Sequence, residues 1–429
     1  MVTTEPPEAG LSDPGRGRGV NTGQADRRTE FRRGWRSLVA ATLGTGVGVT
    51  VISTYTSGLV VNAFGAEFGW TRSQLSSLQL VGSVALIMTA PVVGWMVDRW
   101  GVRWPGGIAL AALGAGYLLL STSGSTFLIY ATLYTVVVVL ASPSTPVSFT
   151  RAVNERFDRA RGVALGISLT FAGVVVFLIP AVLGTVLASD WRTGYRLLGG
   201  AIVGCAVVVV LLMPRSSAGS RTSTEEQPAQ QTTRNGILPF VRRPLFLRLS
   251  ATYLVLTLGI GWIPLLLVAL LRDGGVSAGA AAQTASLIGL TLIGARFGVG
   301  MLVDRFFAPR VGALLLVAAA AGLVALWLGG PAFGAAAAVS VGLALGAEVD
   351  LLGNLTSRYY PAALYGRLFG LFYAVMVLGL GVSPVLITAL RDATGSYSLP
   401  IAASAGLILL AAVSLATAPR FDTEAVVHG

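Results

Sequence analysis

The stretch that decides the fold is Gly94-Trp-Met-Val-Asp98-Arg99-Trp-Gly101-Val-Arg103, a charged turn between two long apolar runs. A related stretch, Gly300-Met-Leu-Val-Asp304-Arg305, ends another apolar run in the second half of the chain, and Arg310 follows it. Each half therefore has a long apolar run that ends in the same kind of charged turn. This repetition predicts two homologous halves.

The composition indicates a membrane protein. The chain has 429 residues, of which 54% are hydrophobic and only 11% are charged, whereas a soluble domain carries about 25% charged residues. The net charge of +11 comes from arginines in turns between apolar runs and in polar segments. We therefore expect lipid headgroups, and not nucleic acid, as the counter-charge. No residue is lysine, so mechanisms that need a lysine amine are excluded.

Few residues are available for enzyme or metal chemistry. Cys205 is the only cysteine and lies within an apolar run, and His428 is the only histidine. A metal site or a histidine-based catalytic group would need a cluster of such residues. No nucleophile and base are paired within the apolar runs. We predict that the protein is not an enzyme and binds no cofactor or metal.

Twelve apolar stretches approach or reach the roughly 20 residues that a helix needs to cross a bilayer. They predict an all-α membrane protein with six-helix halves at 37–213 and 244–418, joined by a cytoplasmic linker at 214–243. The polar residues 1–36 are expected to form a disordered cytoplasmic tail, and 419–429 a second tail. The stretches are 38–62, 75–97, 105–123, 127–149, 162–187, 195–213, 245–270, 281–303, 311–328, 331–355, 368–390 and 399–418.

The arginines predict the orientation in the membrane. Most of the 30 lie in the two tails, in the linker and in the turns after the even-numbered spans. Positive residues are enriched on the cytoplasmic side, so both termini are expected to be cytoplasmic. The predicted opposite side carries only Arg72, Arg192, Arg196, Arg272 and Arg391.

The two charged turns closely resemble the loop between helices 2 and 3 of the major facilitator superfamily and its counterpart between helices 8 and 9. The resemblance implies that the two halves rock about a site near the membrane midplane. It also implies that the first loop latches the halves together on the cytoplasmic side. The alternative is that its arginines only fix the topology. The expected gate residues are Gly94, Asp98, Arg99, Gly101, Arg103, Asp304 and Arg305.

Three charged residues, Arg296, Glu348 and Asp350, lie within predicted spans. A charge inside a membrane is costly, so each one is a candidate functional residue. Glu348 and Asp350 are about 200° apart around a helix, so we expect only one of them to face the cavity and Arg296. One interpretation is a fixed structural ion pair. The other is that Arg296 binds an anionic group of the substrate while an acid carries a proton.

Further segments resemble the monocarboxylate and oxalate/formate branch of this superfamily. They are Phe64-Gly-Ala-Glu67-Phe68-Gly69-Trp70, Arg156-Phe157-Asp-Arg159-Ala-Arg161-Gly-Val-Ala164-Leu-Gly166 and Asp190-Trp191-Arg192. In that branch, the arginine that matches Arg296 is implicated in carboxylate binding. The acid that the family has four residues before that arginine is Leu292 here.

Polar side chains within other spans are candidates for contact with the substrate. Thr50, Ser53, Thr54 and Ser57 recur at helical spacing beside Tyr55, but such hydroxyls also bond to their own helix. The predicted substrate-binding set is Arg296, Tyr55, Ser53, Tyr134, Asn354 and Tyr373.

Together these features predict a monomeric secondary transporter in a bacterial cell membrane. Its substrate is expected to be a small organic anion, a monocarboxylate, moved with a proton or by exchange. One alternative is proton-driven efflux of a drug or secondary metabolite, which a dye-efflux assay would detect. Another is a membrane sensor on the same scaffold, which would bind a ligand without moving it.

Overall fold

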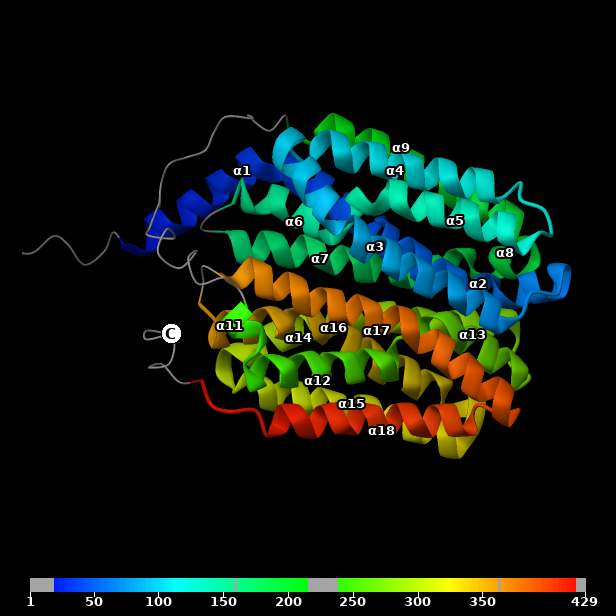
Figure 1. Ribbon diagram of the computed structural model, residues 1–429. Coiled ribbons are helices and arrows are strands. Elements are labelled where there is room, and N and C mark those ends of the chain that lie inside the picture. The colour runs from blue at the N-terminus through cyan, green and yellow to red at the C-terminus, as the bar shows by residue number, and fades with distance from the viewer. Residues whose placement is uncertain (1–18, 158–159, 215–237, 362–363, 422–429) are drawn as a thin grey trace, which may run out of the picture.

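The computed structural model describes residues 19–157, 160–214, 238–361 and 364–421, without the side chains of 19–28, 161, 300 and 304. Every regular element in these ranges is a helix. Two bundles lie side by side, the N-terminal half above the C-terminal half in Figure 1. The start of α1 and the end of α18 lie at the left of this view, which we call the terminal end. The opposite end is called the distal end.

The N-terminal half contains helices α1 to α9. They are α1 Gly19–Gly46, α2 Val49–Phe68, α3 Arg72–Trp100, α4 Arg103–Leu120, α5 Phe127–Ala141, the 3-10 turn η1 Ser142–Ser144, α6 Pro146–Asn154, α7 Arg161–Leu178, the π-helical turn η2 Ile179–Leu183, α8 Gly184–Ser189 and α9 Trp191–Leu212.

The C-terminal half repeats the pattern with longer helices. Its elements are α11 Leu238–Val241, α12 Pro244–Ile260, α13 Ile263–Asp273, α14 Ala278–Arg305, α15 Ala308–Gly329, the 3-10 turn η4 Gly330–Phe333, α16 Gly334–Tyr359, α17 Tyr365–Thr394 and α18 Ser398–Ala416.

The described part of the chain has 10 helical segments long and apolar enough to cross a membrane. One of them, Ala308–Tyr359, contains both α15 and α16. The apolar helix α4 is not among the ten. The predicted number of twelve spans and the side of the membrane on which the termini lie stay predictions.

Four of the predicted spans are interrupted helices, including 162–187, which breaks at the π-helical turn η2. The first breaks between α1 and α2, and the corresponding first span of the C-terminal half breaks between α12 and α13. The span at 127–149 breaks at η1, where Pro143 and Pro146 leave backbone carbonyls without their helical partners. Interrupted helices inside a membrane are tolerated where they line a cavity or are buried in protein.

The helix α1 corrects one prediction. It begins at Gly19, so residues 19–36 are helical and not disordered. This polar part of α1 packs on the turn after α6, because the rings of Phe31 and Phe157 lie 5.3 Å apart. The backbone N–H of Ala160 also donates to Glu30 at 3.0 Å. Sequence polarity marked these residues as lying outside the membrane, but it did not reveal their contacts.

The two halves pack tightly toward the distal end. A Cβ added at Gly58 of α2 would lie 2.3 Å from the carbonyl oxygen of Pro264 in α13. A Cβ at Gly289 of α14 would lie 2.2 Å from the backbone nitrogen of Phe177 in α7. Small residues let helix backbones approach this closely in a membrane. Because the halves are in close contact there, the space between them lies toward the terminal end.

Candidate functional site

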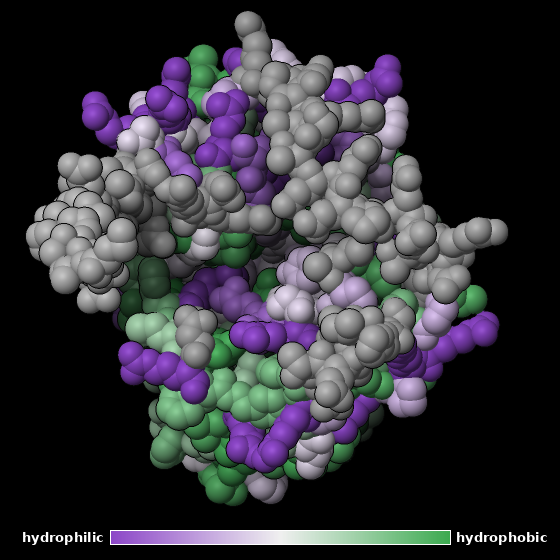
Figure 2. Space-filling view, turned by 90° about the vertical axis from the view of Figure 1, so that its left-hand side faces the viewer, coloured by the Kyte–Doolittle hydropathy of each residue, from purple (hydrophilic) through white to green (hydrophobic). Residues whose placement is uncertain are grey.

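A cavity of about 800 Å³ lies between the two halves. Helices α2, α6 and α7 line one side of it, and α14, α16 and α17 line the other. The lining runs from Gln79, Pro264 and Leu380 to Asn154 and Ser357, which lie in the last turns of α6 and α16. Figure 2 views the terminal end, where hydrophilic side chains gather around a hollow near the middle of the face.

A cation and two acids form the charged group of this cavity. Nη1 of Arg296 on α14 lies 3.6 Å from Oδ1 of Asp350 on α16, and the two side chains are 13% and 32% exposed. This distance defines an ion pair but is too long for a hydrogen bond. Among the described residues, Nε and Nη1 of Arg296 have no hydrogen-bond partner. Arg296 therefore lines the cavity while two of its buried guanidinium nitrogens lack a hydrogen-bond partner among the described residues.

The second acid, Glu348, is only 6% exposed, and its Oε2 has no hydrogen-bond partner among the described residues. Both Glu348 and Asp350 line the cavity. Only Asp350 pairs with Arg296 and is appreciably exposed, whereas Glu348 is buried. The prediction that one of the two acids faces Arg296 and the other does not stays a prediction.

Three predicted polar residues join this charged group. Tyr55 on α2, Tyr373 on α17 and Asn354 on α16 all line the cavity. Tyr55 belongs to the N-terminal half, whereas Tyr373 and Asn354 belong to the C-terminal half. The structure thus brings together residues from both halves around one cation.

Two predicted substrate contacts lie elsewhere. Ser53 and Tyr134 are 7% and 5% exposed and are absent from the cavity lining. The Ser53 hydroxyl donates to the carbonyl of Val49, one turn earlier in α2, at 2.6 Å, and Tyr134 lies in the apolar core. In this structure both side chains turn into the N-terminal bundle and are not among the residues that line the cavity.

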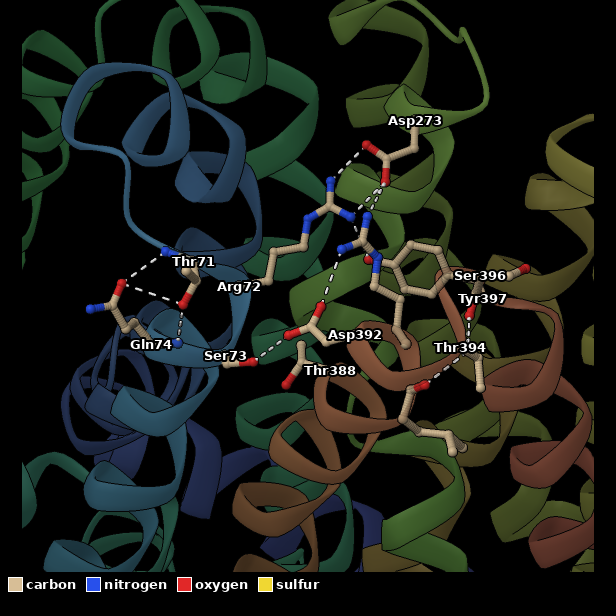
Figure 3. A network of polar contacts seen from close by, with 12 residues as sticks. Thr71, Arg72, Ser73, Gln74, Asp273, Thr388, Asp392, Thr394, Ser396 and Tyr397 are labelled. Atoms are coloured by element: carbon tan, nitrogen blue, oxygen red, sulfur yellow. Dashed lines mark hydrogen bonds and ion pairs between the residues drawn. The ribbon is translucent and has the colours of Figure 1, made fainter.

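A polar cluster joins the two halves at the distal end (Figure 3). The guanidinium of Arg72 forms a two-pronged ion pair with Asp273, with Nη2 to Oδ1 at 2.6 Å, and donates to the Tyr397 hydroxyl at 2.8 Å. Ser73 donates to Asp392 at 2.7 Å. We call these five residues the distal cluster.

Helix ends position the distal cluster. Thr71 and Gln74 form a capping box that starts α3, which fixes the direction of Arg72 and Ser73. Asp273 is the last residue of α13, and Asp392 lies in the last turn of α17 before Gly395, whose φ is 70°. Burial raises the pKa of the Tyr397 hydroxyl, which lies between α17 and α18. The protonated hydroxyl remains available as a bonding partner of Arg72.

The gate motif has a different arrangement at the terminal end. The Asp98 carboxylate pairs with Arg151, which belongs to α6 of the same half. Arg99 and Arg305 are exposed, and Arg103 lies over the Trp104 ring, with its guanidinium 5.4 Å from the ring centroid. Gly94 borders a second pocket, and Gly101 ends α3 with a φ of 70°. The side chain of Asp304 lies outside the described part of the chain.

The sequence interpretation missed several lining residues. Gln79 on α3 donates to Thr54 at 3.1 Å on the cavity wall, and Arg151 adds a second cation to the lining. Arg151 follows the predicted span 127–149, and arginines in such turns indicate topology. Tyr365 and Phe369 also line the cavity, and the available signal was that Tyr365, Phe369 and Tyr373 follow one another at intervals of four residues. Within the described residues, no group of three His, Cys, Asp or Glu residues is placed to hold a metal ion.

The fold and the cavity define a class of protein. The outer surface of the bundle is rich in exposed apolar side chains, including Met88, Leu128, Leu314 and Leu328, as a membrane-embedded bundle requires. Two helical halves enclose a cavity whose lining includes the cation Arg296 and the acids Glu348 and Asp350. These features are those of a multi-pass membrane transporter.

Comparison with known proteins identifies the family. The model of the Major Facilitator Superfamily matches residues 41–384, so the chain belongs to this superfamily. The chain is 27% identical over 398 residues to human monocarboxylate transporter 11, covering 88% of this chain and 81% of that protein. It is 26% identical over 253 residues to monocarboxylate transporter 4 of Gallus gallus, covering 57% of this chain and 52% of that protein. The predicted resemblance to monocarboxylate transporters is confirmed.

Solved structures share the fold. A D-xylose-proton symporter superposes with a TM-score of 0.70 at 15% identity, covering 91% of this chain and 98% of that chain. The peptide transporter POT in complex with sulfate gives a TM-score of 0.71 at 15% identity, with coverages of 90% and 94%. A mutant of the nucleoside transporter NupG gives 0.70 at 10% identity, with coverages of 89% and 98%. At these identities the similarity shows the fold alone.

Proposed function

We propose that the protein is a secondary active transporter of a small organic anion, most simply a monocarboxylate, and that Arg296 binds the anionic group. The observation that carries this proposal is the position of Arg296 on the cavity wall with Nε and Nη1 unpaired among the described residues. Arginine N–H groups match a carboxylate well and bind it strongly when partly buried. The similarity to monocarboxylate transporters supports the same substrate class.

The charge count of the site suggests a route to proton coupling. Arg296, Glu348 and Asp350 carry one positive and two negative charges when all three are ionised. An arriving anion that takes the Arg296 guanidinium leaves both acids without their cation in a partly buried site. An uncompensated charge there is costly, so uptake of one proton with each anion keeps the charge of the site constant. Glu348 and Asp350 are the proposed proton carriers.

The transport cycle proposed here is alternating access. The distal cluster and the seam at Gly58 and Gly289 hold the halves together at one end, while the cavity extends toward the other. The arginine distribution supports cytoplasmic termini in a cell membrane, so this arrangement corresponds to a site open to the cytoplasm. We further propose that Asp98 and its motif engage the other half when the terminal end closes.

Uptake by proteoliposomes tests the proposal. We expect wild-type protein to accumulate labelled propionate or lactate, faster with an inward proton gradient. Hydrogen bonds to charged groups are worth about 1.5–3 kcal/mol, so Arg296→Gln is expected to weaken binding by about tenfold to a hundredfold. Arg192→Gln is the matched control, because Arg192 pairs with Glu67 within the N-terminal half and does not line the cavity.

Three results would contradict the proposal. Equal anion affinity of wild type and Arg296→Gln would show that Arg296 does not bind the anionic group. Binding without any flux would favour the sensor interpretation. Uptake that responds neither to a proton gradient nor to an opposing anion gradient would rule out both transport with a proton and anion exchange.

A further inference from the structure

An aromatic strip runs along the cavity wall on α17. Tyr365, Phe369 and Tyr373 lie at intervals of four residues, so they share one face of the helix, and all three line the cavity. The ring centroids of Tyr365 and Phe369 are 5.7 Å apart with planes at 21°. Those of Phe369 and Tyr373 are 6.2 Å apart with planes at 13°. We call these three residues the aromatic ladder.

The aromatic ladder is distinct from the aromatic core of the same helix. Phe372, one residue from Tyr373, is fully buried and packs on Phe246 with ring centroids 4.6 Å apart. The ladder rings are only partly buried. Aromatic side chains that only pack helices together are expected to be fully buried, as Phe372 is. The ladder rings are not fully buried and line the cavity, so they present ring surface to it.

Glycines keep the surface beside the ladder open. Gly366 lines the main cavity, and Gly370 lines a smaller pocket of about 250 Å³ that Tyr373 also borders. Apart from neighbouring residues and backbone of α17 itself, no heavy atom lies within 4 Å of the position that a Cβ would take at either glycine. Flat ring faces and bare backbone thus lie next to each other on α17.

The ladder leads away from the charged group. Tyr373, at the end of the ladder farther from the terminal end, lines the same cavity as Arg296 and Glu348. Tyr365 lies at the first residue of α17, toward the terminal end. The step of eight residues from Tyr365 to Tyr373 spans about 12 Å at 1.5 Å per residue. A two- or three-carbon acid bound at Arg296 would leave most of this strip uncovered, and the volume of about 800 Å³ is in the range that holds drug-sized ligands.

Resting on the proposed function, we propose that the preferred substrates are aryl carboxylates, whose carboxylate binds Arg296 while the ring packs on the aromatic ladder. Aromatic rings gain affinity from offset stacking and edge contacts beyond the apolar area they bury. The apolar body also takes up space that water would otherwise occupy beside Phe369.

The test compares three acids with the same carboxylate on purified full-length protein: 3-phenylpropionate, 3-cyclohexylpropionate and propionate. Cyclohexyl matches phenyl in size but has no aromatic face. We expect wild type to bind 3-phenylpropionate about two- to tenfold more tightly than 3-cyclohexylpropionate, and propionate most weakly. Phe369→Leu is expected to abolish the preference for phenyl over cyclohexyl, whereas Phe369→Tyr, which keeps the ring, is expected to retain it.

Controls separate this inference from the proposed function. Leu371→Ala changes a side chain on α17 that is 40% exposed and absent from both pockets, so all three affinities are expected to stay unchanged. Thermal unfolding of each variant checks that it is folded. Arg296→Gln is expected to weaken binding of all three acids.

The outcomes are distinguishable. Equal affinity of wild type for the phenyl and cyclohexyl acids, with Arg296→Gln still defective, would overturn the ladder inference alone. Unchanged preference in folded Phe369→Leu would overturn it as well. Binding that is insensitive to Arg296→Gln but still prefers phenyl would overturn the proposed anion site and leave a ring-binding surface.

Discussion

The two ends of the seam between the halves are built differently. At the distal end, Arg72 and Ser73 of the N-terminal half bond to Asp273, Asp392 and Tyr397 of the C-terminal half. At the terminal end, the acid of the gate motif, Asp98, pairs with Arg151 of its own half. Polar bonds at the distal end therefore connect the two halves, whereas the Asp98–Arg151 ion pair at the terminal end lies within one half. In this conformation, opening the terminal end therefore breaks fewer bonds between the halves than opening the distal end.

Removing the carboxylate at the centre of the distal cluster is expected to have the largest effect on how the two ends differ. Asp273→Asn takes away the partner of Arg72 and the second acid near Arg391, whose Nη2 lies 3.8 Å from Asp273. Because the pair is two-pronged but Asp273 is 39% exposed, we expect a loss of about 1 kcal/mol. That loss shifts the ratio of distal-closed to distal-open protein about fivefold. Distances between spin labels on α3 and α13 measure the shift.

A matched ion pair provides the control. Glu67 pairs with Arg192 at the same end, with similar exposure of 38% and 33%, but both residues belong to the N-terminal half. Glu67→Gln is expected to leave the distance between the halves unchanged. An equal shift in both variants would mean that the distal cluster adds nothing specific to closure.

A smaller effect is expected at the terminal end. Asp98 and Arg151 are 64% and 44% exposed, and surface pairs of this kind contribute at most about 1 kcal/mol. Asp98→Ala is therefore expected to leave thermal stability and anion affinity almost unchanged. If Asp98 engages the other half when this end closes, uptake at matched expression falls about two- to fivefold. Uptake equal to wild type would leave the motif a topological role only.

The sequence revealed those features that local patterns encode. The apolar runs, the repeated charged turn and the family resemblance predicted a helical membrane protein of the transporter fold, and the cost of an intramembrane charge singled out Arg296 as a cavity residue. The predicted disordered tail was wrong from Gly19 onward, because polarity indicates that a segment is exposed to water but not that it lacks helix.

Features that depend on tertiary contacts could not be predicted in the same way. Ser73 and Asp392 are separated by 319 residues and Arg72 and Asp273 by 201, and each lies in a turn that looks ordinary by itself. The position of Ser53 and Tyr134 outside the cavity lining could not be predicted for a related reason. Helical spacing groups the hydroxyls of α2 on shared faces, but only the packing of the bundle decides which face borders the cavity.

The central claim is that the cavity around Arg296 opens at the terminal end and is closed at the distal end by the bonded seam. Its most direct test is the labelling of single cysteines by a membrane-impermeant thiol reagent in the C205A background, with Cys205 replaced by Ala. Ser357→Cys, in the last turn of α16, is expected to react with reagent added from the terminal side. Gln79→Cys, deep in the cavity, is expected to be protected from reagent added from the distal side. Adding Asp273→Asn is expected to weaken the distal seam and to remove this protection. Rapid labelling of Gln79→Cys from the distal side in the otherwise unaltered protein would contradict the account.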